Sequence, residues 1–374
     1  MFEPQARASR RELLRRSLVA AAMAHCGLAS APKSLAVSTI DDVGRSELPD
    51  RLQQILTRDE LPALWALFSN AEQTQILEAS GVRAATASDP ATPEDQIHIG
   101  SCTKAMTATL VGLQVDQKKL QWDQPLAALL PTEVLPSGSP LAERTLWQLL
   151  THTAGVPANA PWHDLNQADL PTGRREVVRW TATQALTAPG KFAYSNTGFV
   201  IVGAVLEELL GQPWERTIRE QLWTPLGMER AGFGPPAPPQ PSGHSWTASQ
   251  AVPRRSDNAP VLGPAGTVHL PLDQWARFAR IFIQYKNAKT LLTESSWRRL
   301  QTPAPGTEAA AGWMAVERPK LGGRVLTHAG SNTMWFAVVW VFPARQELAM
   351  AATNVGGDKA PAACDEVIRL LLTS

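Results

Sequence analysis

The distribution of strand-like segments most constrains what this chain can fold into, because these segments cluster at its two ends. Near the start, residues 64–68 and 75–77 are short apolar runs around the polar turn 69–72, a pattern typical of a β-hairpin. Near the end, β-rich runs separated by turn residues cover 324–327, 335–342 and 347–353. Helical patterns fill most of the chain between them. We therefore expect an α/β (α+β) fold in which both chain ends build one sheet, interrupted by a mostly helical insertion.

The insertion and its boundaries follow from the helical periodicity. Apolar residues recur at helical spacing after Ser101. Further helices are expected at residues 145–152, 174–186, 197–210, 272–285 and 360–372. Residues 232–264 are rich in Pro, Gly and Ser and indicate a long surface loop. We expect an α/β domain and a helical insertion domain, with the respective boundaries 37–112 plus 260–374, and 113–259.

The first 36 residues have the composition of an export signal. Arginines precede an apolar stretch, residues 18–28, and Ser34-Leu35-Ala36 offers a small-residue cleavage site. The pair Arg10-Arg11, followed by two leucines, resembles a twin-arginine signal. The apolar stretch is shorter than the about 20 residues that a membrane-spanning helix needs. We expect an exported protein, periplasmic or secreted, without a stable membrane span in the mature chain. A lipoprotein anchored at Cys26 and a merely basic, disordered N-terminus rank lower.

Charge and cysteine content exclude several classes of protein. The formal net charge is +1, and removing residues 1–36 takes away six basic and two acidic residues and leaves −3. Neither balance provides the basic excess that binds nucleic acid, so we expect no nucleic-acid partner. Cys102 and Cys364 are the only cysteines after the signal, too few and too far apart for a disulfide framework or a zinc site.

The first chemical motif is S-x-x-K, formed by Ser101-Cys102-Thr103-Lys104. On a helix this spacing places the serine and the lysine on one face. A serine hydroxyl becomes a good nucleophile when a neighbouring base takes its proton, and a lysine can be that base once burial lowers its pKa. The helix N-terminus beneath Ser101 also directs backbone N–H groups at a developing oxyanion. The alternative is a capping serine followed by a surface lysine, because the motif alone is common by chance.

The second motif is Y-x-N, formed by Tyr194-Ser195-Asn196, and it is the rarer one because the chain has only two tyrosines. The phenol of Tyr194 is suited to carry a proton between nucleophile, water and leaving group. The amide of Asn196 is suited to bind a substrate carbonyl. Alternatively, Tyr194 is a core aromatic residue and Asn196 caps the helix that starts at Thr197.

The third candidate is His328-Ala329-Gly330, at the end of an expected strand. A glycine there allows a ligand to approach the strand backbone closely. His328 is then placed to bind or polarise a substrate, and the N–H of Ser331 to supply an oxyanion donor. Taken alone, a histidine at a strand end more often has no chemical role, and this alternative stays open.

Together the three motifs resemble the serine β-lactamase and penicillin-binding protein superfamily, in its class C β-lactamase, esterase and D-aminopeptidase branch. Further similar stretches follow along the chain: 149–157, 194–199 with Glu207, 225–228, 263–266 leading to Asp273, and 353–354. The resemblance covers about residues 50–374. It implies an α/β domain with an antiparallel sheet, a helical domain inserted in it, and an active site in the cleft between the two.

The resemblance also implies a role for each motif. Ser101 attacks a carbonyl to form an acyl-enzyme, and Lys104 takes or relays its proton. Tyr194 protonates the leaving group and later activates the hydrolytic water. The backbone N–H groups of Ser101 and Ser331 form the oxyanion hole. Asn196, His328 and Gly330 are the further candidates for binding the substrate. No metal or organic cofactor is implied, and the sequence has no H-E-x-x-H motif or Gly-rich phosphate loop.

One departure from the superfamily bears on the substrate. Many members carry Lys-Thr-Gly where this chain has His328-Ala329-Gly330. The lysine and the threonine help bind the carboxylate of a β-lactam or a peptide, whereas a neutral histidine and an alanine bind that anion less well. H-x-G variants are familiar among the family's esterases. We therefore expect a carboxylesterase-like serine hydrolase that acts on a small ester, amide or peptide.

Alternatives of two kinds remain beside the esterase. Within the same acyl-enzyme chemistry they are β-lactam hydrolysis and cleavage of D-amino peptides, as by a D-alanyl-D-alanine carboxypeptidase or a D-aminopeptidase. Of a different class is a non-hydrolysing penicillin-binding or sensor protein on the same fold, which is acylated once or only binds a cell-wall fragment. Stable acylation without turnover would distinguish the sensor from the hydrolases.

Overall fold

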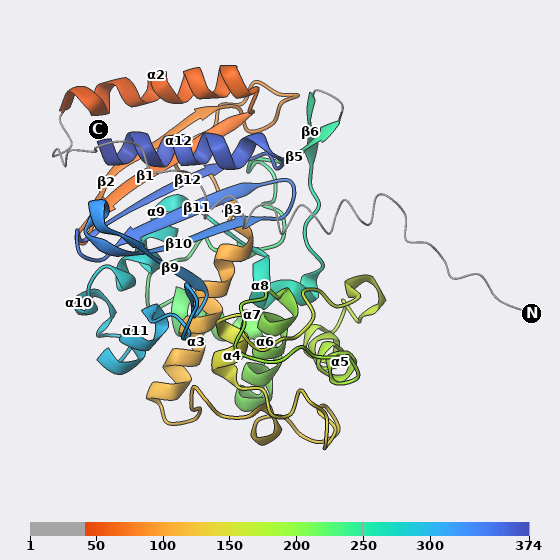
Figure 1. The fold of residues 1–374 in the computed structure, drawn as a ribbon. Helices are drawn as coiled ribbons and strands as arrows, with labels where there is room; N and C mark the ends of the chain where they lie inside the picture. Colours follow the sequence, from red (N-terminus) through yellow and green to blue (C-terminus); the bar gives the residue numbers. More distant parts are fainter. Residues whose placement is uncertain (1–41, 248–249, 374) are drawn as a thin grey trace, which may run out of the picture.

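The computed structural model describes residues 42–247 and 250–373. Within these residues the centre is a seven-stranded sheet in the order β2-β1-β12-β11-β10-β9-β8, and each neighbouring pair is antiparallel. Its strands are β1 (Ala63–Asn70), β2 (Thr74–Gly81), β8 (Ala309–Ala310), β9 (Trp313–Arg318), β10 (Gly323–Ser331), β11 (Phe336–Phe342) and β12 (Glu347–Thr353). The first two strands come from the start of the chain and the others from its end (Figure 1). The predicted antiparallel sheet built from both chain ends is confirmed.

The predicted export signal lies outside the described residues. The structure does not describe residues 1–41, so the twin-arginine-like signal stays a prediction and the lipid anchor at Cys26 a lower-ranked alternative. In the part of the chain that is described, no helix is long and apolar enough to cross a membrane.

Alternating side chains along the strands separate two hydrophobic cores. In β1, Trp65 and Leu67 face one side of the sheet while Leu64 and Ala66 face the other, and all of them are buried. Figure 1 shows the helices that cover the second side together at its top, namely α2 (Asp42–Asp59) and α12 (Lys359–Thr373). Most other helices pack against the first side. Because burying a leucine-sized side chain contributes roughly 1.5–3 kcal/mol, these two cores hold the sheet between its helices.

The helices expected from the periodicity are present, with shifted ends. Between the two groups of strands lie α3 (Thr103–Asp116), α4 (Leu146–Leu150), α5 (Leu170–Ala182), α6 (Asn196–Leu210), α7 (Trp214–Ile218), α8 (Gly263–Gly266), α9 (Leu272–Ala279), α10 (Tyr285–Ala288) and α11 (Glu294–Gln301). The helix expected over 272–285 is divided, because a 3-10 turn at Arg280–Phe282 separates α9 from α10. The lower half of Figure 1 is mostly helical, and the predicted domain boundaries stay a prediction.

Local capping signals set the ends of two helices near the candidate motifs. α4 begins with a capping box in which the Thr145 hydroxyl accepts the N–H of Gln148 and the Gln148 side chain accepts the N–H of Thr145. α6 is capped by Ser195, whose hydroxyl accepts the N–H of Gly198. The interpretation that Asn196 caps this helix is therefore wrong. α6 ends at Gly211, which has a left-handed φ of 65°.

Residues 232–264 are not the long surface loop that their composition predicts. β4 (Gly232–Phe233) pairs with β7 (Val268–Leu270), and β7 also pairs with β3 (Ile97–His98). β5 (Gly243–Thr247) pairs with β6 (Gln250–Arg254). Strands this short leave no alternation in the sequence to detect, which is why composition alone indicated a loop.

The same segment contacts the α/β part of the molecule, although it was expected in the helical insertion. The backbone N–H of His244 donates to the carbonyl oxygen of Met334, just before β11. The His244 ring is fully buried and accepts the N–H of Ala85 at 2.9 Å. The segment therefore packs against the α/β part of the molecule at His244, where partners outside the segment satisfy its polar groups.

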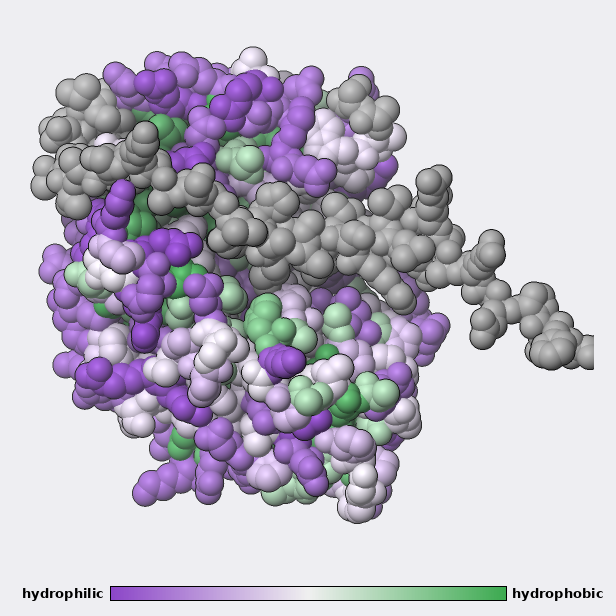
Figure 2. All heavy atoms as spheres, in the orientation of Figure 1, coloured by the Kyte–Doolittle hydropathy of each residue, from purple (hydrophilic) through white to green (hydrophobic). Residues whose placement is uncertain are grey.

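The surface of the described residues is mostly polar. Figure 2 shows hydrophilic side chains over most of the visible face, with apolar ones scattered among them. Among the described residues, Phe192 is the large apolar side chain that is exposed, at 41%. It lies two residues before Tyr194, at the Y-x-N motif.

Candidate active site

Ser101 lies where a helix begins against the central sheet. Residues Gly100–Cys102 form a 3-10 turn, η1, that leads directly into α3. The turn approaches β10 so closely that a Cβ on Gly330 would come within 2.7 Å of the Ser101 backbone nitrogen. Gly100 has a φ of +50°, and a Cβ on it would lie 2.4 Å from the Ser331 nitrogen. Two glycines therefore allow the backbones of Ser101 and Ser331 to lie side by side.

Lys104 follows Ser101 by one turn, and its side chain is 0% exposed. Its Nζ lies 3.1 Å from Ser101 Oγ, 2.8 Å from Asn196 Oδ1 and 2.6 Å from the carbonyl oxygen of Ala265. The same Nζ is 4.9 Å from the centre of the Tyr194 ring. All of these partners are uncharged.

The protonation state of Lys104 follows from this environment. Burial lowers the pKa of Lys104 well below its usual value, because the ammonium form loses its hydration. A neutral amine has two N–H groups and one lone pair. The oxygens of Asn196 and Ala265 can only accept hydrogen bonds, so they take both N–H groups. The lone pair is left for the Ser101 hydroxyl, which prepares Lys104 to take the serine proton.

Tyr194 reaches the serine from the segment that precedes α6. Its hydroxyl donates to Ser101 Oγ at 2.8 Å. Burial raises the pKa of Tyr194 above its usual value, so the phenol keeps its proton near neutral pH. The structure thus places Ser101 Oγ within hydrogen-bond reach of both Lys104 and Tyr194, which the motifs propose as its partners.

Asn196 lies beside the base. Its Oδ1 accepts from Lys104, and its Nδ2 donates to Asn159 Oδ1 at 2.9 Å. These two contacts fix the direction of the amide and make Asn196 a positioning residue for Lys104. One N–H of Nδ2 is left beyond the contact with Asn159, so the predicted contact with a substrate carbonyl stays a prediction.

His328 is buried within β10, a longer strand than the sequence predicts. Its Nδ1 lies 2.8 Å from the carbonyl oxygen of Ala329. Because a carbonyl oxygen can only accept, Nδ1 carries the proton and Nε2 is the acceptor nitrogen. Burial lowers the pKa of His328 to about 3. The ring is therefore neutral at physiological pH.

Gly330 and Ser331 end β10 beside the nucleophile. The Ser331 hydroxyl accepts the N–H of Thr333 at 2.9 Å, so its side chain is engaged in the following turn. Its backbone nitrogen lies next to Gly100 and the Ser101 backbone, as the close approach of the two glycines requires. This places two backbone N–H groups near the serine, the number that an oxyanion hole needs.

His152 is a neighbour of the site to which the sequence assigned no role. Its Nδ1 accepts the N–H of Ser195 at 3.1 Å, and its ring centroid lies 4.4 Å from that of Tyr194. Burial lowers the pKa of His152 well below its usual value, so it supports Tyr194 as a neutral ring. His152 lies in the stretch 149–157 that resembles the superfamily, but this local resemblance gave no indication that His152 contacts Tyr194.

The arrangement supplies a nucleophile, a neutral amine beside it, a phenol that can donate a proton, and two backbone N–H groups. These are the parts that acyl transfer from an ester or amide requires. Among residues 42–247 and 250–373, no group of three or more His, Cys, Asp or Glu side chains is placed to hold a metal ion.

Comparison with known proteins agrees with this geometry. A protein-family model described as Beta-lactamase matches residues 48–373. Penicillin-binding protein 4 of Amycolatopsis lactamdurans is 28% identical over 190 residues, which are 49% of this chain and 47% of that protein. The D-alanyl-D-alanine-carboxypeptidase/endopeptidase AmpH of Escherichia coli K12 is 25% identical over 245 residues, 60% of this chain and 62% of that protein.

A solved structure gives the same result for the fold. A class C β-lactamase from Rhodobacter sphaeroides matches with a TM-score of 0.71 at 18% identity, covering 87% of this chain and 99% of that chain. At this identity the likeness concerns the fold alone. The chain spans about half the length of the first curated relatives that it matches, 47% of one and 54% of another.

Proposed function

Because this chain belongs to the β-lactamase family, whose model matches residues 48–373, we propose that it is a serine hydrolase that forms an acyl-enzyme at Ser101 and prefers esters. The geometry supports a step-by-step mechanism. Lys104 takes the proton of Ser101 as Oγ attacks the substrate carbonyl. The oxyanion that forms is stabilised by the N–H groups of Ser101 and Ser331.

Tyr194 completes the first half of the reaction as a proton donor. Its hydroxyl already points at Ser101 Oγ, and its raised pKa keeps it protonated until an alkoxide leaves. The alkoxide takes the phenolic proton, and the proton on Lys104 restores the phenol. In the second half, water attacks the acyl group, Tyr194 relays its proton to neutral Lys104, and the proton returns to Ser101 Oγ as the bond between Oγ and the acyl carbon breaks.

The preference for esters rests on one observation, the protonation of His328. Its Nδ1–H is used by the carbonyl oxygen of Ala329, so the neutral ring has only the acceptor Nε2 left for a ligand. A lone pair repels a carboxylate, whereas the lysine of Lys-Thr-Gly members attracts one. β-lactams and peptides with a free C-terminus carry that carboxylate, and simple esters do not. Burial lowers the pKa of His328 to about 3, so acidification within the usual working range does not restore a charge.

The second candidate is hydrolysis of a β-lactam or of a cell-wall peptide. It is favoured by the matches to a penicillin-binding protein and to a protein named as a carboxypeptidase/endopeptidase. Export of the protein, predicted from residues 1–36, would place it where such peptides occur, and we include export in the proposal.

Side-by-side hydrolysis of two chromogenic substrates tests the proposal. A short-chain p-nitrophenyl ester and a chromogenic cephalosporin are given to the protein and to its Ser101→Ala variant. We expect ester turnover that falls on the order of 10⁴-fold in the variant, and a negligible cephalosporin rate. Fast serine-dependent cephalosporin turnover would move the β-lactamase candidate to first place. Ester turnover that survives in the folded variant would refute the role of Ser101, and acylation without turnover would identify a sensor.

A further inference from the structure

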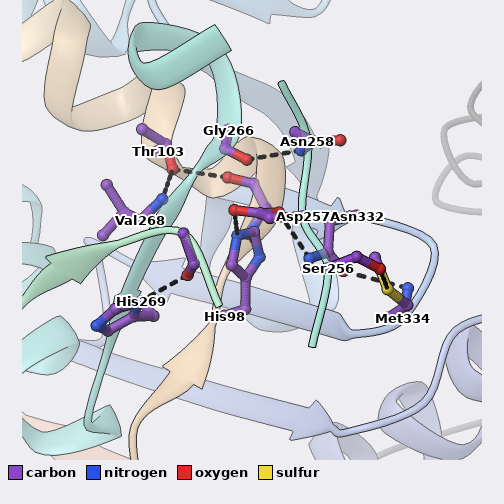
Figure 3. Close-up of polar contacts among 12 residues, drawn as sticks. His98, Thr103, Ser256, Asp257, Asn258, Gly266, Val268, His269, Asn332 and Met334 are labelled. Atoms are coloured by element: carbon purple, nitrogen blue, oxygen red, sulfur yellow. Dashed lines mark hydrogen bonds and ion pairs between the residues drawn. The ribbon is translucent and has the colours of Figure 1, made fainter. Parts of the chain in front are cut away.

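A buried chain of hydrogen bonds behind the active site joins three side chains from distant parts of the sequence. His98 ends β3, Asp257 lies between β6 and the 3-10 turn Pro260–Leu262, and Asn332 directly follows β10. Figure 3 shows Asp257 between the other two, with a dashed contact to each. His98 and Asn332 are buried, and so is the carboxylate of Asp257.

The first half of the chain ends on the backbone just before the nucleophile. The N–H of Gly100 donates to His98 Nδ1 at 3.2 Å. Since Nδ1 accepts, the ring proton is on Nε2, which donates to Asp257 Oδ2 at 2.9 Å. The carboxylate makes the ring a better acceptor for the Gly100 N–H, because hydrogen bonds in a chain polarise one another.

The second half ends on the backbone just after the other oxyanion donor. Asn332 Nδ2 donates to Asp257 Oδ1 at 2.8 Å, and its own Oδ1 accepts the N–H of Met334 at 3.1 Å. Asn332 is covalently next to Ser331. One carboxylate therefore holds, through one residue on each side, the segments that carry the N–H groups of Ser101 and Ser331.

The peptide that carries the Ser101 N–H is held at its oxygen as well. The carbonyl oxygen of Gly100 accepts from Thr103 Oγ1 at 2.7 Å, and the N–H of Val268 donates to that same hydroxyl at 3.3 Å. Figure 3 shows Thr103 at the centre of these contacts. With His98 on the Gly100 N–H and Thr103 on the Gly100 oxygen, the direction of the following N–H is fixed on both sides.

We propose that His98, Asp257 and Asn332 are positioning residues that align the two backbone N–H groups of the oxyanion hole. The inference rests on the proposed function, because only an acyl-transfer reaction builds charge at that place. None of the three side chains touches the reacting atoms through the contacts described. Their effect lies in the transition state, where a donor misplaced by a fraction of an ångström stabilises the oxyanion less.

Asp257→Asn is the test variant, because it keeps the shape and breaks one contact. The carboxylate of Asp257 accepts hydrogen bonds from both His98 and Asn332. The amide of an asparagine has only one oxygen, so its NH₂ group faces one of these two donors and that hydrogen bond is lost. We expect kcat for the p-nitrophenyl ester to fall roughly 10- to 100-fold, with KM within about 2-fold. A binding role would instead raise KM.

The double variant Asp257→Asn with Asn332→Asp is the rescue. The amide at 257 then accepts from His98 as before and donates to the new carboxylate at 332, so both contacts are restored and only the second is reversed in direction. We expect kcat to return to within about 3-fold of the parent. If Asp257→Asn fails to fold, Asn332→Ala replaces it as the single variant. We expect its kcat to fall less than the kcat expected for Asp257→Asn.

His244→Gln is the matched control for loss of stability. His244 is a fully buried histidine like His98, and its partners are Ala85 and Asn354. If His244→Gln lowers the unfolding temperature as much as Asp257→Asn does, we still expect the kcat of His244→Gln to equal that of the parent. The proposal is refuted if the folded Asp257→Asn variant keeps the parent kcat, if the control loses as much, or if the rescue fails in a folded protein.

Labelling with a fluorophosphonate separates this proposal from the proposed function. Its phosphorus bonds Ser101 Oγ as fluoride leaves, with negative charge on the phosphoryl oxygen in the oxyanion hole. If the parent is labelled at Ser101 and Asp257→Asn reacts 10- to 100-fold more slowly, the alignment role is supported. Equal rates would refute the alignment role and leave the proposed function standing. A parent that is not labelled would refute the proposed function itself.

Discussion

Two buried basic side chains in this molecule are surrounded in opposite ways. Lys104, in the candidate site, and Arg174, in α5, are both 0% exposed. The guanidinium of Arg174 forms ion pairs with Glu207 and Glu215 and donates to the carbonyl oxygen of Val261 at 3.1 Å. The amine of Lys104 contacts only uncharged groups in the bonds described above.

The difference shows how the same degree of burial makes Lys104 a neutral base and leaves Arg174 a charged residue that joins several helices. Burial alone lowers the pKa of Lys104, so it becomes a neutral amine. Around Arg174 the burial that lowers the pKa is outweighed by two carboxylates, which raise it. Its charge persists and ties α5, α6 and α7 to the segment before α8.

The largest effect is expected from Lys104→Met, which removes the base and keeps the volume. The hydroxyl of Ser101 then has no amine to take its proton. We expect kcat for the ester to fall on the order of 10⁴-fold, equivalent to ~5 kcal/mol of activation free energy. Circular dichroism on the same sample checks that the variant is folded.

The same variant tests whether Lys104 is neutral. Between the lowered pKa and its usual value of 10.5, the unfolded chain binds a proton at this lysine and the folded chain does not. The parent therefore gains stability as pH rises through that window, and Lys104→Met does not. The stability of the variant relative to the parent should fall between pH 7 and pH 10 in urea unfolding. A constant difference would mean that the folded lysine is charged.

Arg174→Met is expected to act on stability and leave the chemistry intact. It leaves the carboxylates of Glu207 and Glu215 without their cation, and Glu207 is nearly fully buried. We expect a loss of about 3–5 kcal/mol in the free energy of unfolding, measured with urea, and a kcat within about 3-fold at 25 °C.

Adding Glu207→Met and Glu215→Gln to Arg174→Met completes the comparison. Removing the buried charges together should recover most of the lost stability, because no unpaired ion is left. A single variant that loses less than about 1 kcal/mol would show that the cluster does not hold these helices together. A fall in kcat in the folded Arg174→Met variant, beyond the expected 3-fold, would show that this cluster is coupled to the active site.

What the sequence could predict depends on how local each signal is. Ser101 and Lys104 lie one helical turn apart, so their spacing alone places them together, and the rarity of tyrosine makes Tyr194 a strong candidate. The sheet from both chain ends followed from the β-rich runs at those ends. Helix α2 was missed because Pro49 lies inside it and breaks the pattern that predicts helices.

What the sequence could not predict depends on contacts between distant residues. Asp257 lies in a segment that its composition marks as a loop, and its partners His98 and Asn332 are far away in the chain. The pairing of Asn196 with Lys104, and of His152 with Tyr194, likewise needs the folded backbone. Neither the hydrophobic periodicity nor the composition of the sequence predicts contacts between such distant residues.

The smallest effect is expected from His328→Gln, which asks whether the site contains a second group made neutral by burial. The unfolded chain takes a proton at this histidine below 6.5, and the folded chain does not until about pH 3, because burial lowers the pKa of His328 to that value. The parent therefore loses stability as pH falls through this window, by ~2 kcal/mol between pH 7 and pH 5.

Glutamine keeps an N–H group for the carbonyl oxygen of Ala329 and does not titrate. In urea unfolding, the parent should lose ~2 kcal/mol more than His328→Gln on going from pH 7 to pH 5. Parallel losses in the two proteins would mean that the folded ring becomes charged as readily as the free one. The site would then hold a positive charge for a carboxylate in mild acid, and the argument for esters would fail.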